Sequence, residues 1–167
     1  KFIDRYFGKY QGCYNYIQEE RDRLLDSKLA ISNFGRRRAL LEIDSVNEGM
    51  VQAALREGIN SPIQGDASDI TWCAAWRLMK WLRKYKMLSK LVAIVHDAIY
   101  LDLYRKELQD ILPMWYKFMT DRQWFEKHTG WFCTIRLDID VKLGPNLWDM
   151  KELKGNMGNF QIPAGIV

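Results

Sequence analysis

The apolar residues at the start of the chain recur with the period of an amphipathic helix. This pattern covers residues 1–26, and Gln11-Gly12 interrupts it. Beyond it, residues 29–32 and 39–43 have the composition of two short strands. The expected start of the chain is therefore a broken helix, followed by two strands that flank a turn.

Two helices are predicted in the middle of the chain, with a restart signal between them. Ser45 and Glu48 have capping-box spacing, so the first helix should begin at Ser45 and end near Glu57. Ser61 can cap the second helix, and Pro62 suits its first position, where a missing N–H has no cost. That helix should run to about residue 86, with a buried face made of Ile63, Ala67, Ile70, Ala74, Leu78, Trp81 and Leu82.

A short apolar run after this helix predicts a β-hairpin. Residues 91–95 are apolar and rich in β-branched side chains, His96-Asp97 interrupts them, and residues 99–103 resume the pattern. Two apolar strands with a tight polar break indicate an antiparallel pair. Turns often use Asp for conformational reasons alone, and the same carboxylate is also a candidate ligand for a divalent cation.

The last third of the chain should contain another helical region and one long strand. Residues 105–127 are rich in Leu, Trp, Phe and Met, with Pro113 either early in the helix or kinking it. Residues 135–143 alternate strictly between apolar and charged positions, which is typical of a strand. Residues 155–167 are expected to be a loose tail. Strands in one antiparallel sheet, covered by long helices on one face, make an α+β fold.

Composition adds that the chain is ordinary globular material with room for a hydrophobic core. Of its 167 residues, 48% are hydrophobic and 28% are charged. The net charge is +4, and the basic excess lies in residues 1–40. Such an excess suits contact with a polyanion, although a solvated basic face is the commoner explanation. No apolar run approaches the roughly twenty residues of a membrane span, so no membrane partner is expected.

The three cysteines indicate a protein of cytosolic type. Cys13, Cys73 and Cys133 lie far apart, without the spacing of zinc ligands or of a C-x-x-C motif. We expect reduced, mostly buried thiols. The sequence starts at Lys1, inside a predicted helix and without a signal peptide, so the chain is expected to be part of something larger.

Three signatures follow one another along the chain and resemble those of a known family. Residues 34–38 read F-G-R-R-R, residues 56–70 read R-E-G-I-N-S-P-I-Q-G-D-A-S-D-I, and residues 95–97 read V-H-D. They resemble the G-R-R-R turn, the R-x-x-I-N-x-P-I-Q-G-x-A-x-D-I signature and motif C of family A DNA polymerases, the DNA polymerase I family. Asn146-Leu147-Trp148 is similar to the N-W near that family's C-terminus.

The resemblance implies a domain organisation and extends over roughly residues 1–153. It implies the C-terminal part of a polymerase palm together with the base of the fingers. Residues 1–60 would form base-of-fingers helices and the basic turn. Residues 61–153 would form the palm portion, with its long helix, motif C hairpin and final strand. Residues 154–167 would be a tail.

The same resemblance makes Asp97 the motif C ligand of catalytic Mg²⁺ and places His96 close to the primer terminus. Nucleotidyl transfer of this kind uses two divalent ions, which prefer carboxylate oxygens held on a stiff backbone. A hydrogen-bonded, partly buried histidine is the simpler interpretation of His96. Ala98 departs from the family, which usually has Glu there, and this puts metal affinity or rate in doubt.

Six further residues are expected to bind DNA. By resemblance, Arg56, Asn60 and Gln64 line the minor groove, where every base pair offers an acceptor to such donors. Helix capping and a surface ion pair are the simpler alternatives for these three. The residues of the basic turn are candidate phosphate contacts, and a solvated turn is the alternative explanation for them: Arg36, Arg37 and Arg38.

Two acids of the second signature are expected to be structural. We expect Asp66 and Asp69 to complement the dipole of a helix's first turns.

Two parts of the polymerase signature are absent from the sequence. Nothing matches motif A, D-Y-S-x-x-E, or the nucleotide-binding finger helix. We therefore expect a chain that is inactive alone and that needs an upstream polymerase polypeptide carrying both. Its other partners would be primer-template DNA and dNTP, and its location the cytoplasm of a bacterium or phage-infected cell.

Two alternatives belong to other functional classes. The chain could be a non-catalytic DNA-binding or scaffold remnant of a polymerase, with Ala98 as a sign of decay. It could also be a metal phosphohydrolase built on His96 and Asp97. The latter needs several more histidine ligands, and the sequence has only His128 besides His96.

Overall fold

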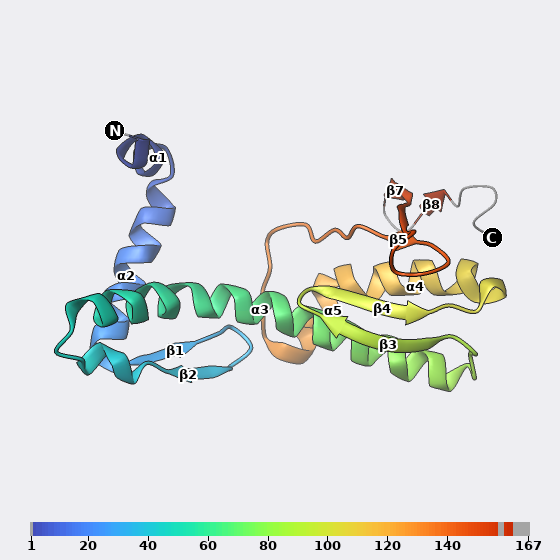
Figure 1. The fold of residues 1–167 in the computed structure, drawn as a ribbon, viewed down its shortest axis with the longest axis horizontal. Helices are drawn as coiled ribbons and strands as arrows, with labels where there is room; N and C mark the ends of the chain where they lie inside the picture. Colours follow the sequence, from blue (N-terminus) through green and yellow to red (C-terminus); the bar gives the residue numbers. More distant parts are fainter. Residues whose placement is uncertain (1, 157–158, 162–167) are drawn as a thin grey trace. The chain divides into compact units, whose positions relative to one another are not determined.

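Five α-helices and four two-stranded antiparallel sheets make up the part of the chain that the computed structural model describes, residues 2–156 and 159–161. This confirms the predicted α+β class, although the strands pair in separate hairpins instead of one sheet. The chain divides into two units, residues 1–67 and 68–167, which are described separately below (Figure 1).

The first unit begins with the predicted broken helix. Helix α1 spans Phe2–Lys9 and helix α2 spans Gln11–Ser27, so the break falls next to Gln11-Gly12 as expected. Tyr10 separates them with φ −115° and ψ 60°, which are not helical angles. Lys28 ends α2 in the left-handed conformation, and its N–H caps the helix at the carbonyl of Leu24.

A short hairpin follows, with its second strand earlier than predicted. Strand β1, Leu29–Ile31, pairs with strand β2, Arg37–Ala39, and the predicted strand at 39–43 is instead the 3₁₀ helix η1, Leu41–Asp44. The tight turn explains the difference. The N–H of Gly35, at φ 81°, donates to the carbonyl of Ser32. Because this turn is short, pairing between the two strands resumes already at Arg37, within the run of three arginines.

The core of the first unit needs a glycine at position 58. A Cβ at Gly58 would overlap Leu40 Cδ1 and would lie 2.7 Å from Leu24 Cδ1, so only glycine allows this approach. The buried apolar residues come from α2, β1, the residue between β2 and η1, η1 itself and α3; they are Leu24, Ala30, Leu40, Ile43, Ala54 and Leu55.

Helix α3 is continuous from Glu48 to Lys84, so the predicted restart at Ser61-Pro62 is wrong. Proline inside a helix costs about 3 kcal/mol, because it lacks an N–H and clashes with the preceding turn. Tertiary packing outweighs that local preference, since Leu55 before Pro62 and Leu78 after it are fully buried. The helix also begins later than Ser45, because Asn47 accepts the hydrogen bond from the Gly49 N–H at 2.9 Å.

The predicted buried face of this helix is only half right. Ala74, Leu78 and Leu82 are buried, whereas Ile63 is 56% exposed and Ala67 is exposed as well. The first unit packs against other positions of the helix, including Gly58, which a simple apolar count does not reveal.

The second unit is built around the predicted hairpin. Strand β3, Lys90–Val95, pairs with strand β4, Ala98–Asp102, and the hairpin lies alongside α4 and the C-terminal half of α3 (Figure 1). Its core residues come from α3, β4 and α4; they are Ala74, Ala75, Leu78, Leu82, Ile99, Ile111 and Phe118.

The helical region after the hairpin is divided in two. The 3₁₀ helix η2, Arg105–Glu107, leads into α4, Leu108–Thr120, which contains Pro113, and α5 spans Arg122–Thr129. The division falls at Asp121, whose side chain accepts a hydrogen bond from the N–H of Trp124 at 3.1 Å and so caps α5. The sequence predicted one helical region and missed this cap.

The long strand predicted at 135–143 is wrong apart from its end. Among the described residues, only Lys142–Leu143 (β5) is paired there, with Lys151–Glu152 (β6). The alternation of apolar and charged residues gives an extended segment two different faces, but it does not specify a partner strand. A β-ladder cannot form without one. The predicted tail contains a further pair, Lys154–Asn156 (β7) with Asn159–Gln161 (β8). Residues 157–158 and 162–167 of that tail lie outside the described residues.

Two further expectations concern the cysteines and a membrane span. All three cysteines are free thiols, but Cys13 is exposed and Cys73 and Cys133 are half-buried, so the prediction of mostly buried thiols is wrong. The described residues contain no helix that is both long and apolar enough to cross a membrane.

Candidate metal ligand and nucleic-acid interface

The β3–β4 hairpin ends in a two-residue turn that carries His96 and Asp97. Val95 and Ala98 are paired residues of the ladder, so nothing else separates the strands. His96 has φ 55°, the positive value that the first turn residue of a type II′ hairpin adopts. Both side chains are exposed. The structure thus places the Asp97 carboxylate at the end of a hairpin, as predicted, and His96 is not partly buried.

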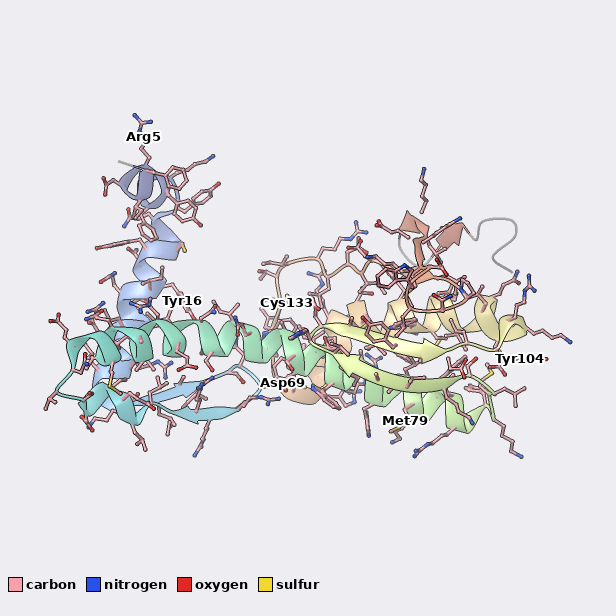
Figure 2. All side chains as sticks on the ribbon, in the orientation of Figure 1. Arg5, Tyr16, Asp69, Met79, Tyr104 and Cys133 are labelled. Atoms are coloured by element: carbon pink, nitrogen blue, oxygen red, sulfur yellow. The ribbon has the colours of Figure 1, made fainter. Side chains whose placement is uncertain are left out.

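The open end of the same hairpin is held by Glu107, which sequence reasoning missed. Its carboxylate accepts hydrogen bonds from the backbone N–H of Leu88 at 2.8 Å, the N–H of Ser89 at 2.9 Å and the Ser89 hydroxyl at 2.7 Å. The Ser89 hydroxyl in turn accepts from the N–H of Tyr104, labelled in Figure 2, at 2.8 Å. These contacts join the chain before β3 to the chain after β4.

The hydrogen bonds to Glu107 also change its acidity. Burial alone would raise the pKa of this carboxyl, but the N–H groups of Leu88 and Ser89 and the Ser89 hydroxyl outweigh it and lower the pKa. Glu107 is therefore a carboxylate at neutral pH. No local motif marks it, because its partners lie nearly twenty residues earlier in the chain.

The hairpin turn can supply one ligand to a hard cation. Mg²⁺ prefers carboxylate oxygens and needs few of them from protein, so the exposed Asp97 side chain fits as a ligand. Ala98 offers no side-chain ligand. In the described part of the chain, no three His, Cys, Asp or Glu side chains gather in a way that could hold a metal ion. Asp97 would thus contribute to a metal site without completing it.

Arg56, Asn60 and Gln64 form an exposed row on one helix, here called the α3 polar stripe. All three belong to α3, at intervals of four residues, and all three side chains are exposed. The predicted break at Ser61-Pro62 would have divided them between two helices. Because α3 continues through Pro62, they share one face.

The basic turn also lies against α3. A Cβ added at Gly65, next to Gln64, would lie 3.9 Å from the side chain of Arg36. Arg37 is exposed on β2, and Arg38 forms an ion pair with Glu57, which adjoins Arg56 in sequence. Both groups of residues that the sequence predicted to bind DNA therefore belong to the first unit, one on α3 and the other on the hairpin that packs against it.

Asp66 does not act as the first-turn acid that the sequence predicted. It lies well inside α3, is 8% exposed, and accepts hydrogen bonds from the backbone N–H of Asn33 at 2.9 Å and from Asn33 Nδ2 at 2.6 Å. Tyr16 of α2, labelled in Figure 2, is near enough that the charge of Asp66 contributes to its raised pKa, after the larger effects of burial and Glu20.

The half-buried thiol of Cys73 has little nucleophilic character. Burial first, and then the charge of Asp69, raise its pKa, which Arg77 opposes. The thiol is thus protonated near neutral pH, and a thiolate chemistry has no support here.

Comparisons with known proteins all lead to DNA polymerases. The model of DNA polymerase family A matches residues 1–149. DNA polymerase I of Pseudomonas aeruginosa PAO1 is 35% identical over 68% of this chain and 13% of its own length. The DNA polymerase of Bacillus phage SP01 is 25% identical over 90% of this chain and 16% of its own length.

A solved structure agrees with these sequence relatives. The POL domain of Pol1 from M. smegmatis, in complex with DNA primer-template and dNTP, superimposes with a TM-score of 0.68 and 27% identity, over 71% of this chain and 21% of that one. The fold is thus that of part of a polymerase domain. The chain belongs to DNA polymerase family A, and it spans about one sixth or less of the length of the two curated relatives named above.

Proposed function

We propose that this chain forms part of the active site of a template-directed DNA polymerase that adds dNTPs to a primer 3′ end. The observation that carries this proposal is the exposed Asp97 carboxylate in the two-residue turn of a hairpin in a family A chain. Two Mg²⁺ ions, when bound, would stabilise the attacking and leaving oxygens of nucleotidyl transfer.

In this proposal Asp97 is a metal ligand and the hairpin is its rigid support. Small misplacements of groups at a reaction centre are costly, so a ligand gains from a stiff backbone. The β3–β4 ladder, the helices packed against it and the Glu107 hydrogen bonds supply that stiffness. His96, which precedes Asp97 in the exposed turn, would approach the primer terminus. Ala98 would leave this site with one carboxylate fewer than the family usually has.

The α3 polar stripe would contact the DNA minor groove. Each base pair presents an acceptor there at N3 or O2, so Arg, Asn and Gln donors can inspect the shape of a pair without reading its sequence. A polymerase needs this indifference to sequence. Arg36 and Arg37 would contact backbone phosphates, which position the duplex. A phosphate contact by Arg38 would compete with its ion pair to Glu57.

The chain would need further groups to be active. One carboxylate cannot hold two cations, and the described residues contain no cluster of three or more potential ligands. Motif A and the nucleotide-binding finger helix would therefore come from residues outside this sequence. By itself, the chain of 167 residues should not extend a primer.

The test combines the chain with a polymerase polypeptide that carries motif A and the finger helix, together with Mg²⁺, primer-template and dNTPs. Extension should require both polypeptides, and Asp97→Asn should lower its rate at least about a hundredfold. Asp102→Asn, an exposed acid at the other end of β4, should leave the rate unchanged. Equal rates for wild type and Asp97→Asn would refute the proposal, as would extension by this chain alone.

A second candidate is favoured by Ala98, which follows the metal-binding position. A remnant that binds DNA without catalysing transfer would keep the α3 polar stripe and would lose ligands at the hairpin turn. In that case the chain would bind primer-template DNA, while no added polypeptide would restore extension. Asp97→Asn would then change neither property.

A further inference from the structure

We propose that Asp66 and Asn33 are a positioning pair that holds the basic turn against helix α3, so that Arg36 and Arg37 are fixed in place to contact DNA phosphates. This inference rests on the proposed DNA-binding function and deepens it. Asp66 uses both carboxylate oxygens on one residue of the turn, Oδ1 on the backbone N–H of Asn33 and Oδ2 on its side-chain Nδ2. This bidentate contact fixes the orientation of Asn33 as well as its distance.

The turn that Asp66 holds is itself stiff. The N–H of Ser32 donates to the carbonyl of Arg36 at 2.9 Å, and the Ser32 hydroxyl accepts from the Arg36 N–H at 3.2 Å. Gly35 closes the turn on the carbonyl of Ser32. Anchoring Asn33 therefore anchors the backbone on which Arg36 and Arg37 stand.

The turn also packs on α3 next to this contact. Asp66 is two residues after Gln64, and a Cβ at the intervening Gly65 would meet Ser32 Cβ at 3.6 Å. The turn thus rests directly on α3. The Arg38–Glu57 ion pair also joins β2 to α3, but both of its side chains are about half exposed, so it contributes little.

The electrostatics indicate a positioning role instead of a direct contact. A carboxylate on a DNA-binding surface would repel phosphates. Asp66 is only 8% exposed, and two hydrogen bonds from Asn33 occupy its oxygens, so it acts on DNA through the turn that it holds. Burying an acid has a free-energy cost, which these charge-assisted hydrogen bonds offset.

The experiment measures the affinity of the full chain for a fluorescent primer-template duplex by anisotropy over a range of salt concentrations. Asn33→Asp places two carboxylates face to face and should weaken binding about tenfold, and the salt slope should fall by about one for each phosphate that the turn no longer reaches. The double variant Asn33→Asp with Asp66→Asn exchanges the two groups. The new amide on α3 can then accept from the backbone N–H of the turn and donate to the new carboxylate there, so affinity should return to within about twofold of wild type.

A matched control separates position from charge. Asn47→Asp adds the same single charge to the first unit, at an exposed helix cap whose side-chain oxygen can still accept from Gly49, and its affinity should fall no more than about twofold. Melting curves for each variant report whether it is folded. Equal losses in Asn33→Asp and Asn47→Asp, or no recovery in the double variant, would overturn the positioning role while leaving the proposed function intact. A wild-type chain that does not bind the duplex would overturn the proposed DNA contacts, and this inference with them.

Discussion

The carboxylate of Glu107 accepts hydrogen bonds from both the backbone N–H and the hydroxyl of Ser89, and so closes the open end of the β3–β4 hairpin. These bonds lower the pKa of Glu107 from its usual 4.5. A carboxyl with a lower pKa in the folded state stabilises the fold above the unfolded pKa, and this stabilisation disappears as the pH falls through the folded value.

Glu107→Gln should therefore lower the stability of the chain at pH 7, and the difference from wild type should shrink on acidification below about pH 4.5. Thermal unfolding followed by circular dichroism at several pH values measures both effects. Glu126→Gln removes the same charge from an exposed side chain of α5 and is the control. A deficit that stays constant from pH 7 to pH 3 would mean that ionisation of Glu107 does not contribute.

His96→Gly should stabilise the chain and impair the polymerase. His96 has φ 55°, a conformation that costs an ordinary residue about 1 kcal/mol and costs glycine almost nothing. Urea unfolding should show this gain, and primer extension in the combined assay should fall, because the turn next to Asp97 becomes less restricted.

Lys86→Gly is the matched control, since Lys86 has φ 52°, is exposed and lies outside the proposed site. It should gain similar stability and leave extension unchanged. If both variants leave extension unchanged, His96 has no role beyond the turn.

Two glycine substitutions should have opposite effects on the first unit. Gly58→Ala forces a methyl group into Leu40 and Leu24 and should cost about 1–3 kcal/mol of unfolding free energy. Gly12→Ala, in α2 with nothing within 4 Å of the new Cβ, should gain up to about 1 kcal/mol from helix propensity. Urea denaturation of both variants tests the close packing, which would be refuted if Gly58→Ala were as stable as Gly12→Ala.

Arg77 should be important for the stability of the second unit. Its side chain is 9% exposed, donates to Asp121 at 2.8 Å, and lies 4.7 Å and 4.2 Å from the ring centroids of Phe118 and Trp124. Arg77→Met should cost about 2–4 kcal/mol, because it removes the cation beside the two rings and leaves Asp121 without this charged partner.

Asp121→Asn should cost less than Arg77→Met, because Asn can still cap α5 through the Trp124 N–H. Arg136→Met, which breaks an exposed pair with Asp138, should change stability by less than about 1 kcal/mol. Denaturant titrations of the three variants give the comparison. A cost for Arg77→Met no larger than that for Arg136→Met would contradict a structural role of the buried pair.

Local patterns predicted the elements whose formation depends on neighbours in sequence. The apolar runs on either side of His96-Asp97 predicted the right hairpin, because β-branched residues and a two-residue break define both strands and turn. The break near Gln11-Gly12 and the helix after residue 105 were predicted for the same reason. The family resemblance, carried by short signatures, was confirmed by the match over residues 1–149.

Local patterns failed where distant contacts decided the outcome. Pro62 has a strong preference to begin a helix, yet burial on both sides keeps α3 continuous and aligns Arg56 with Gln64. Residues 135–141 have the alternation of a strand, but pairing depends on a neighbour that alternation does not specify.

The sequence by itself determined the family, the α+β class and the position of Asp97 in a hairpin turn, because each depends on residue types at short, fixed spacings. Only the tertiary structure decided that Asp66 binds Asn33 and that Glu107 binds Ser89. Those contacts join residues far apart in the chain, and a carboxylate finds such donors through packing, which no local pattern encodes.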